Sequence, residues 1–478
     1  MLLLIGVCAK TSFVIDLIII EFSFIFDIHI KSAYRIMEWQ RLLSSKRFGM
    51  EEFHDDRKHD RTDFQRDYDR LIFSSPFRRL QNKTQVFPLP GSVFVHNRLT
   101  HSLEVSTVGR SISLIISKAL RKKYPDSSAP FEEIGAIVAA ACLAHDLGNP
   151  PFGHSGEKAI STYFSEGKGS VLQDEIVGEG RRWEDFINFD GNANSIRLLT
   201  HQFAGRRKGG FVMTYSTLAS IIKYPFSSEL ANGKGKLGFF ESEEQDVVRI
   251  ADELGIHKKK EVPLELVRYP LVFLVEAADD ICYKIMDIED AHKLHILTTE
   301  KTIELFMNFF PIERQEKMRK VLNIVNDVNE QLAYLRSNVI GLLVEECAQV
   351  FLSHEEEILQ GAFNRPLIKE IPERSCEAYK ICTEYSVKYI YKAKDVLDIE
   401  LAGYRIIGLL LDTLITAIRN QDKAYSQLLL SRVPEQYEVH AESLYTRTLA
   451  VLDYISGMTD VYALDLYRKI TGMSLPAV

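Results

Sequence analysis

The sequence predicts an all-α protein with only a minor β-hairpin, and three observations lead to this fold class. In FEEIGAIVAAACLAHD (131–146), apolar side chains recur with the helical period and share one face with His145. The chain shows no alternation of strand and helix patterns typical of a parallel sheet, and no P-loop or GxGxxG pattern. Its 478 residues are 46% hydrophobic and 26% charged, which suits two or three globular domains or one large helical body.

The first 36 residues are strongly apolar, yet they carry Lys10, Asp16, Glu21 and Asp27. No run of about 18 uncharged apolar residues exists there, and each carboxylate inside a bilayer costs about 2.5–3.5 kcal/mol. The basic start and the cleavage site of a signal peptide are not evident either. We therefore expect the working protein to begin near Met37, with residues 1–36 a translation-start artefact or a disordered extension. A membrane or export role for this leader is the alternative.

Helical periodicity continues through most of the remaining chain. We expect helices over 99–123, 264–295, 300–352, 376–392, 400–420 and 443–470. The polar, glycine-rich segments 165–182 and 227–238 predict loops. FAGRRKGGF (203–211) predicts a tight basic turn or a small hairpin.

The charge balance and the cysteines narrow the function classes. A net charge of −8 argues against nucleic acid as the dominant ligand, although a local basic cleft remains open. The six cysteines form no CxxC pair, so neither a disulfide framework nor a zinc knuckle is indicated. We expect a protein of the reducing cytoplasm.

Titratable residues gather in CLAHDLGNPPFGHSGE (142–157), where the predicted apolar helix ends. His145 lies on the inward stripe of that helix. Asp146 beside it would be a buried carboxylate, which is costly unless it is paired or bound to metal. We expect Gly148 to stop the helix, whose carboxyl end favours a cation. One metal ion held by both side chains would satisfy these constraints.

Two other segments offer further ligands. His101 stands near the start of another predicted helix, in HNRLTHSLEV. In EAADDICYKIMDIEDA (276–291), Asp279, Tyr283 and Asp287 share one helical face next to a strongly apolar run. Buried acids on such a helix indicate a site. Imidazole and carboxylate ligands together suit Mn²⁺, Mg²⁺, Fe, Co²⁺ or Zn²⁺, with positions left open for water and substrate.

Longer motifs surround these residues. They are RTDFQRDYDRLIFSSPFRRLQNKTQVF (61–87), NRLTHSLEVSTVGR (97–110), HDLGNPPFGHSGE (145–157), FDGNANSIRLL (189–199), IIKYPF (221–226), EAADDICYKIMDIEDA (276–291), IELAGYRIIGLLLD (399–412) and LDYISGMTDVYALDLYRKI (452–470). Together with the order H…HD…D, they resemble the deoxyguanosine triphosphate triphosphohydrolases (dGTPases), a branch of the HD superfamily of metal-dependent phosphohydrolases. The resemblance implies an HD core over 37–300 and a helical region over 301–478 that completes the substrate pocket and the oligomer contacts, with the leader 1–36 outside it.

The resemblance also implies residue roles. The metal ligands would be His101, His145, Asp146 and Asp279, and the catalytic pair His154 and Glu157. From spacing alone Asp280 stays open as the ligand in place of Asp279. Enzymes of this family cleave at the α-phosphorus and release a deoxynucleoside and intact tripolyphosphate. The metal would polarise a phosphate oxygen and activate water, while His154 acts as general acid or base and Glu157 orients it. We expect dGTP to be the best substrate, with other dNTPs as further candidates.

Substrate contacts follow from the same resemblance. Arg98, Lys223 and Tyr224 would meet the phosphates and sugar, Tyr283 and Asp287 the deoxyribose, and Gln85 and Val86 the base, with Glu400, Arg405 and Arg447 as weaker candidates. A tyrosine ring against C2′ would exclude a 2′-hydroxyl, and a triphosphate requires converging cations. Relatives assemble as oligomers, commonly hexamers, and we expect a homo-oligomer here.

Several alternatives remain open at this point. A cluster of His54, Asp55, Asp56, His59 and Asp60 would be a second metal site or, more simply, a solvated or subunit-contacting helix start. GRRKGG (205–210) would contact a phosphate or single-stranded DNA, the latter as an effector alongside dNTPs. The function itself has two competitors: another HD hydrolase, such as a nucleotidase or phosphodiesterase, and an inactive nucleotide-binding scaffold.

Overall fold

The fold is helical, as predicted. A computed structural model describes residues 36–51, 60–87, 95–231 and 235–473, and within them the only sheet has two strands. Strand β1 (Lys258–Lys260) pairs antiparallel with β2 (Glu265–Leu266), with Lys258 opposite Leu266. The leader and the cluster from His54 to His59 lie outside the described residues, so the expectations for them stay as predictions.

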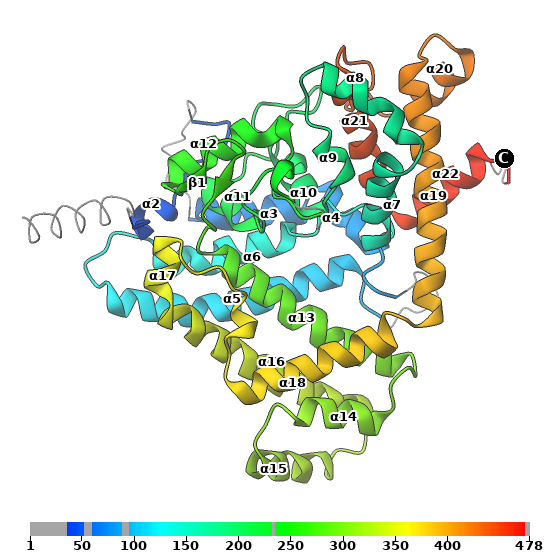
Figure 1. Cartoon of the computed structure of the whole chain (residues 1–478). Coiled ribbons are helices and arrows are strands. Elements are labelled where there is room, and N and C mark those ends of the chain that lie inside the picture. Colours follow the sequence, from blue (N-terminus) through cyan, green and yellow to red (C-terminus); the bar gives the residue numbers. More distant parts are fainter. Residues whose placement is uncertain (1–35, 52–59, 88–94, 232–234, 474–478) are drawn as a thin grey trace, which may run out of the picture.

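The helices follow one another along the whole described chain (Figure 1). The first half contains α2 (Trp39–Leu42), α3 (Asp63–Ile72), α4 (Ser75–Arg79), α5 (Arg98–Lys123), α6 (Ile134–Ala144), α7 (His154–Ser165), α8 (Gln173–Gly178), α9 (Glu184–Ile187), α10 (Gly191–Thr200), α11 (Tyr215–Ile221) and α12 (Glu244–Leu254). The second half contains α13 (Val272–Lys293), α14 (Thr299–Met307), α15 (Ile312–Leu322), α16 (Val328–Ser353), α17 (Glu355–Gln360), α18 (Glu373–Tyr385), α19 (Lys394–Arg419), α20 (Ala424–Leu430), α21 (Leu444–Ser456) and α22 (Asp460–Ile470).

Helix α6 is the central element of the larger core. Its sequence IGAIVAAACLA is apolar on every side, so the helix is stable only where neighbours surround it. Helices α3, α5, α11 and α13 provide this cover. Gly109 of α5 permits the close crossing, because a Cβ there would lie 2.8 Å from the sulfur of Cys142. The carboxyl end of α6 is thereby held next to α5 and α13.

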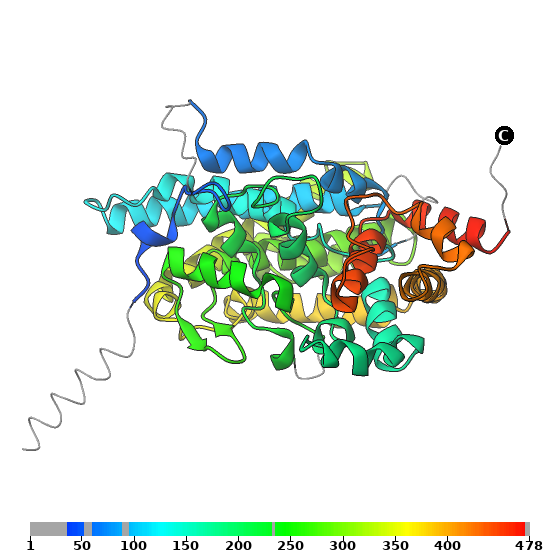
Figure 2. The ribbon, with the colours of Figure 1, turned by 90° about the horizontal axis from the view of Figure 1, so that it is seen from above.

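A second apolar core lies at the end of the molecule where α19 stands. Leu410, Leu411 and Leu414 of α19 are buried against α7, α21 and their neighbours. Helix α19 runs across the direction of α3 and α5, so that it is seen end-on in Figure 2. It is also the one described helix long and apolar enough to cross a membrane by length and composition, but half of its most apolar window is buried inside the protein.

Several predicted boundaries are corrected. The helix expected over 264–295 begins only at Val272, because Pro270 disfavours helical geometry in the residue before it. The stretch 300–352 is three helices, α14 to α16, with Pro311 capping the second. Similarly, 376–392 passes from α18 into a π-helical turn at residues 386–390, and 443–470 splits into α21 and α22, because Thr459 caps a new helix.

Other local expectations were wrong in part. Residues 165–182 are not one loop, since they contain a 3₁₀ turn and α8, and 227–238 contains a 3₁₀ turn at residues 228–230. Residues 203–211 form turns, as one of the two alternatives predicted, but no strand forms there, and the small hairpin is β1–β2 instead. Helix α6 ends at Ala144, before Gly148, so that glycine does not stop the helix.

A buried ion cluster joins α10 to α21. The Arg197 guanidinium donates from Nε to Asp453 Oδ1 at 2.9 Å, from Nη2 to Asp453 Oδ2 at 2.8 Å, and from Nη1 to Glu243 Oε1 at 2.7 Å. The three side chains are at most 6% exposed. Two carboxylates in this interior are tolerable only because one guanidinium serves both.

Arg197→Ala should therefore destabilise the fold by about 3–5 kcal/mol, because it leaves Asp453 and Glu243 buried without a counter-charge. The free energy of unfolding is measured in urea. Arg419→Ala is the matched control, since its ion pair with Glu175 is exposed and should be worth about 0–1 kcal/mol. Equal losses in the two variants would show that the buried cluster does not hold α10 to α21.

Candidate metal centre and active site

Four side chains converge from three helices. His101 lies in the first turns of α5, His145 and Asp146 directly follow α6, and Asp279 lies in α13. Ligand atoms of His101, His145 and Asp146 all lie within 4.8 Å of one another. Asp279 Oδ1 is 3.2 Å from His101 Nε2 and 3.7 Å from His145 Nε2. Two imidazoles and two carboxylates form a donor set that suits a divalent cation.

The hydrogen bonding of His145 fixes which nitrogen faces this cluster. Its Nδ1 lies 2.6 Å from the backbone oxygen of Cys142. A carbonyl only accepts, so Nδ1 carries the proton and Nε2 presents its lone pair. Within the described residues, Nε2 is buried and has no hydrogen-bond partner. A ligating histidine is arranged in this way, with its second nitrogen bound to a carbonyl.

The Asp146 carboxylate is oriented by two neighbours. Arg98 Nη1 donates to Oδ2 at 2.6 Å, and the side-chain amide of Asn149 donates to Oδ1 at 2.5 Å. Burial raises the pKa of Asp146, but the positive charge of Arg98 outweighs this effect and leaves the pKa below its usual value. The carboxylate is therefore ionised at neutral pH, as a metal ligand must be.

Asp279 and its neighbour Asp280 are in different environments. Burial raises the pKa of Asp279, but the hydrogen bond with His101 and the positive charge of Lys223 bring it well below its usual value. Burial raises the pKa of Asp280 to about 7. No ion pair within the described residues involves Asp280, whereas Asp279 touches the histidines. The geometry thus favours Asp279 as the ligand.

The segment between Asp146 and α7 is tightly packed. A Cβ on Gly148 would lie 2.2 Å from the backbone nitrogen of Ser195, so only glycine fits against α10 there. Phe152 and Gly153 both have positive φ, 62° and 56°, and Phe152 is a strained residue for that reason. Asp460 of α22 holds this conformation by accepting from the Phe152 backbone nitrogen at 2.9 Å.

His154 and Glu157 form a pair at the start of α7. His154 Nδ1 lies 2.9 Å from Glu157 Oε2, and Glu157 Oε1 accepts from the backbone nitrogen of Gly191 at 2.8 Å. Burial raises the pKa of Glu157, but the hydrogen bond with His154 and the charge of Lys236 leave it lowered. The His154 side chain is 64% exposed and that of Glu157 only 11%. A fixed carboxylate thus orients an accessible imidazole.

This pair lies close to the metal cluster. A Cβ on Gly153, the residue before His154, would come within 2.5 Å of Arg98 Nη2. Arg98 in turn donates to Asp146. Arg98 therefore lies between the start of α7 and the His–Asp cluster.

A tyrosine-rich wall flanks the other side of the cluster. The rings of His101 and Tyr283 lie 6.5 Å apart, edge to face, and those of Tyr283 and Tyr391 lie 6.0 Å apart. Tyr391 donates to Asp287 Oδ2 at 2.6 Å. Burial raises the pKa of Asp287 to about 7. Tyr283 and Asp287 therefore lie near the ligands, on the face of α13 that the sequence indicates.

Some of the remaining sequence-predicted residues lie near the cluster or in the core, and others make no polar contact with the cluster. Lys223 lies 3.6 Å from Asp279 Oδ2, with Tyr224 next to it, and Gln85 has a buried Oε1 without a partner among the described residues. Val86 packs on the core. No hydrogen bond or ion pair in the described chain joins Glu400, Arg405 or Arg447 to the cluster; Arg405 is exposed and Arg447 donates to the nearby Ala441 oxygen at 3.3 Å.

Comparison with known proteins identifies the family of this chain. The model of the HD domain matches residues 98–209, and that of the phosphohydrolase-associated domain matches residues 370–469. A deoxyguanosinetriphosphate triphosphohydrolase-like protein of Synechocystis sp. is 37% identical over 92% of this chain and 100% of its own length. One from Pseudomonas aeruginosa is 35% identical over the same shares, and a deoxyguanosinetriphosphate triphosphohydrolase of Yersinia pseudotuberculosis is 31% identical over 85% of this chain and 93% of its own.

The chain belongs to the dGTPase-like family of HD-domain phosphohydrolases. HD domains bind divalent metals, and His101, His145 and Asp146 form a candidate site for one in this structure.

Three residues around the HD-domain site were missed by sequence reasoning. Asn149 orients Asp146, Tyr391 binds Asp287, and Asp460 holds both Phe152 and the Thr84 backbone nitrogen, the latter at 2.8 Å. Asn149 lies inside a motif already singled out, so its amide was a detectable signal. Tyr391 and Asp460 each bind a residue more than a hundred positions away in the sequence, so no local sequence pattern identifies them.

Replacing Asp279 by Asn in this HD-domain protein should abolish binding of Mn²⁺, because an amide oxygen is a weaker, uncharged ligand. Asp280→Asn is the matched control at the adjacent position, and it should retain the metal. Metal content after dialysis and titration calorimetry both measure the difference. Loss of metal in Asp280→Asn with retention in Asp279→Asn would reassign the ligand.

His96 gives a pH-dependent prediction for the start of α5. Its Nδ1 lies 2.8 Å from Asp290 Oδ2 and its Nε2 3.0 Å from Glu104 Oε1. Burial lowers the pKa of His96, but the hydrogen bonds to Asp290 and Glu104 outweigh this effect. The pKa therefore rises from 6.5 to about 10. Since the folded pKa lies above the unfolded one, this stabilisation is complete below about pH 6.5 and is lost as the pH rises through about 10.

His96→Gln should therefore lower the free energy of unfolding most near about pH 6 and least near about pH 10. Urea unfolding of both proteins across this range measures the difference. A difference that grows with pH would contradict the ion-paired histidine.

Proposed function

We propose that this protein hydrolyses dGTP at the α-phosphorus to deoxyguanosine and intact tripolyphosphate in a metal-dependent reaction, with other dNTPs as further substrates. The observation that carries the proposal is the accessible His154, oriented by buried Glu157, with Arg98 between the start of α7 and the His–Asp cluster. The relative from Yersinia pseudotuberculosis bears the name of this activity.

The residues at hand fit each part of the reaction. A divalent ion held by His101, His145, Asp146 and Asp279 would polarise a phosphate oxygen and lower the pKa of a water molecule. His154 is bound to Glu157 through Nδ1, so proton transfer to or from the reacting oxygens occurs at Nε2.

Cations on both sides of the cluster suit the triphosphate. Arg98 is buried beside Asp146, and Lys223 lies on the opposite side, next to Asp279. Burial lowers the pKa of Lys223, but Asp279 and Glu276 raise it above its usual value, so the amine is charged. In this proposal both side chains bind phosphate oxygens, with Tyr224 beside Lys223.

The remaining side chains suit contacts with the deoxyribose and the base. In this proposal the ring of Tyr283 packs against C2′ and excludes a 2′-hydroxyl, and Asp287, which accepts a hydrogen bond from Tyr391, accepts another from a sugar hydroxyl. Gln85 offers its unpartnered Oε1 to an amino group of the base, beside Val86. The orphaned acceptor supports this assignment because buried acceptors without donors are costly.

The region 301–478 completes the site and the assembly in this proposal. Tyr391 reaches Asp287, and α19 packs on α7, which carries His154. Leu397, Leu401 and Tyr404 form an exposed stripe on α19 that suits contacts between subunits of a homo-oligomer, with a hexamer as the expected state. Glu400 and Arg447 remain in the proposal as substrate contacts on family resemblance alone. The proposed setting is the cytoplasm.

Product analysis tests the reaction. The protein with Mn²⁺ is given each dNTP and GTP separately, and products are separated by ion exchange. Deoxyguanosine with intact tripolyphosphate, and GTP left unchanged, is the expected result. Orthophosphate or a nucleoside monophosphate would instead indicate another class of HD hydrolase, and absence of turnover with mixed dNTPs or single-stranded DNA present would indicate a binding scaffold.

His154→Ala should keep the metal and lower kcat about 10²–10⁴-fold, because it removes the proton-transfer group without touching a ligand. His440→Ala, an exposed histidine far along the chain, is the control and should have wild-type kcat. Full activity of His154→Ala would rule out its catalytic role.

A further inference from the structure

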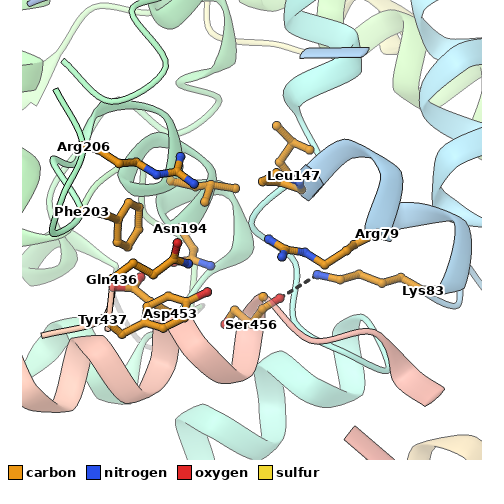
Figure 3. A pocket seen from close by; sticks show the side chains of 13 residues that line it. Arg79, Lys83, Leu147, Asn194, Phe203, Arg206, Gln436, Tyr437, Asp453 and Ser456 are labelled. Atoms are coloured by element: carbon orange, nitrogen blue, oxygen red, sulfur yellow. Dashed lines mark hydrogen bonds between the residues drawn. The ribbon is translucent and has the colours of Figure 1, made fainter. Parts of the chain in front are cut away.

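A small cavity borders the loop that follows His145 and Asp146. Leu147 of that loop forms one wall, α4 and Lys83 another, and the end of α21 the floor (Figure 3). The cavity is about 30 Å³, which is room for a small ion or a few waters rather than for a whole nucleotide. Its lining includes none of the candidate metal ligands and neither His154 nor Glu157, so it is distinct from the proposed nucleotide site.

Positive charge predominates in this cavity. Arg79 and Arg206 point into it from opposite sides, and Lys83 reaches it from below Arg79 (Figure 3). Within the described residues, no hydrogen bond or ion pair joins either guanidinium to a carboxylate. The one acid in the lining, Asp453, already binds Arg197 through both oxygens.

Burial makes this unpaired charge costly. Burial lowers the pKa of Arg79, and the nearby charge of Arg206 lowers it too. Burial also lowers the pKa of Lys83 to about 7. The Lys83 amine donates only to the backbone oxygens of Asn149, at 2.6 Å, and Ser456, at 2.7 Å, so its contacts there are neutral. Like charges that face one small space, where the only acid in the lining is already paired, are stabilised by an anion.

An unpartnered hydroxyl provides an independent observation. Ser456 is 2% exposed and lines the cavity, and its Oγ has no hydrogen-bond partner among the described residues. Buried hydroxyls nearly always have a partner, so an orphan on a cavity wall points to a bound ligand or water. A hydroxyl beside converging guanidinium groups is a donor set that suits a tetrahedral oxyanion.

We propose that this cavity binds a phosphoryl group, held by Arg79, Arg206 and the Ser456 hydroxyl. The group comes either from free inorganic phosphate or from the end of a polyphosphate chain, since both present the same oxygens. This proposal does not depend on the proposed reaction, because phosphate can bind in the cavity without catalytic turnover.

The test measures binding of inorganic phosphate to the full metal-loaded protein by titration calorimetry. The variant R79Q/R206Q removes two cations from the cavity, and R78Q/R207Q removes their exposed neighbours at the same net charge. We expect R79Q/R206Q to weaken phosphate binding about tenfold or more, and R78Q/R207Q to leave it within about twofold. Phosphate held at the metal centre would persist in both variants and so cannot produce this difference.

Two single variants control for a folding defect in the double variant. Arg206 is exposed in a loop, so R206Q leaves the core intact and should still weaken binding. S456A removes only the orphaned hydroxyl and should weaken binding to a smaller extent. Tighter binding of tripolyphosphate than of phosphate, sensitive to R79Q/R206Q, would assign the site to a chain end; the reverse order would assign it to free phosphate. Equal affinity in both double variants, or no phosphate binding beyond the metal centre, would overturn the proposal.

Discussion

A carboxylate buried beside two imidazoles requires a cation. The buried Asp146 therefore constrains which residues surround it and where the neighbouring helices begin and end. Arg98 supplies a permanent positive charge from α5, and Asn149 binds the second oxygen from the following loop. Helix α5 must therefore start at a definite place, which the Asn97 cap and the His96–Asp290 contact secure. The apolar α6 can carry Asp146 inward only because α3, α5, α11 and α13 enclose it.

The helical fold and the His–Asp convergence were accessible to sequence reasoning for a physical reason. The apolar face of 134–145 is continuous, so the direction of His145 follows from helical geometry. Asp279 and Asp280 show where that reasoning ends. Adjacent residues on a buried helix point about 100° apart, and only the position of His101 decides between them.

Boundaries and distant partners were less accessible. Pro270, Pro311 and Thr459 interrupt long apolar patterns that continue across them, so periodicity alone merged separate helices. Lys83 meets Ser456 from 373 residues away, and Tyr391 meets Asp287 from 104 residues away. Such pairs depend on the whole packing arrangement. The residues responsible are ordinary lysines and tyrosines until the chain brings them together.

The loop from Leu147 to Gly153 has a consequence for how the chain can change. Its backbone is packed against Ser195 at Gly148, bonded to Asp460 at Phe152, and pressed on Arg98 at Gly153. Surface loops usually accept insertions, but this one works as a spacer of fixed length between Asp146 and His154. One added or deleted residue would shift His154 relative to the candidate metal ligands. The separation along the chain is thus as much a part of the site as the side chains at its two ends.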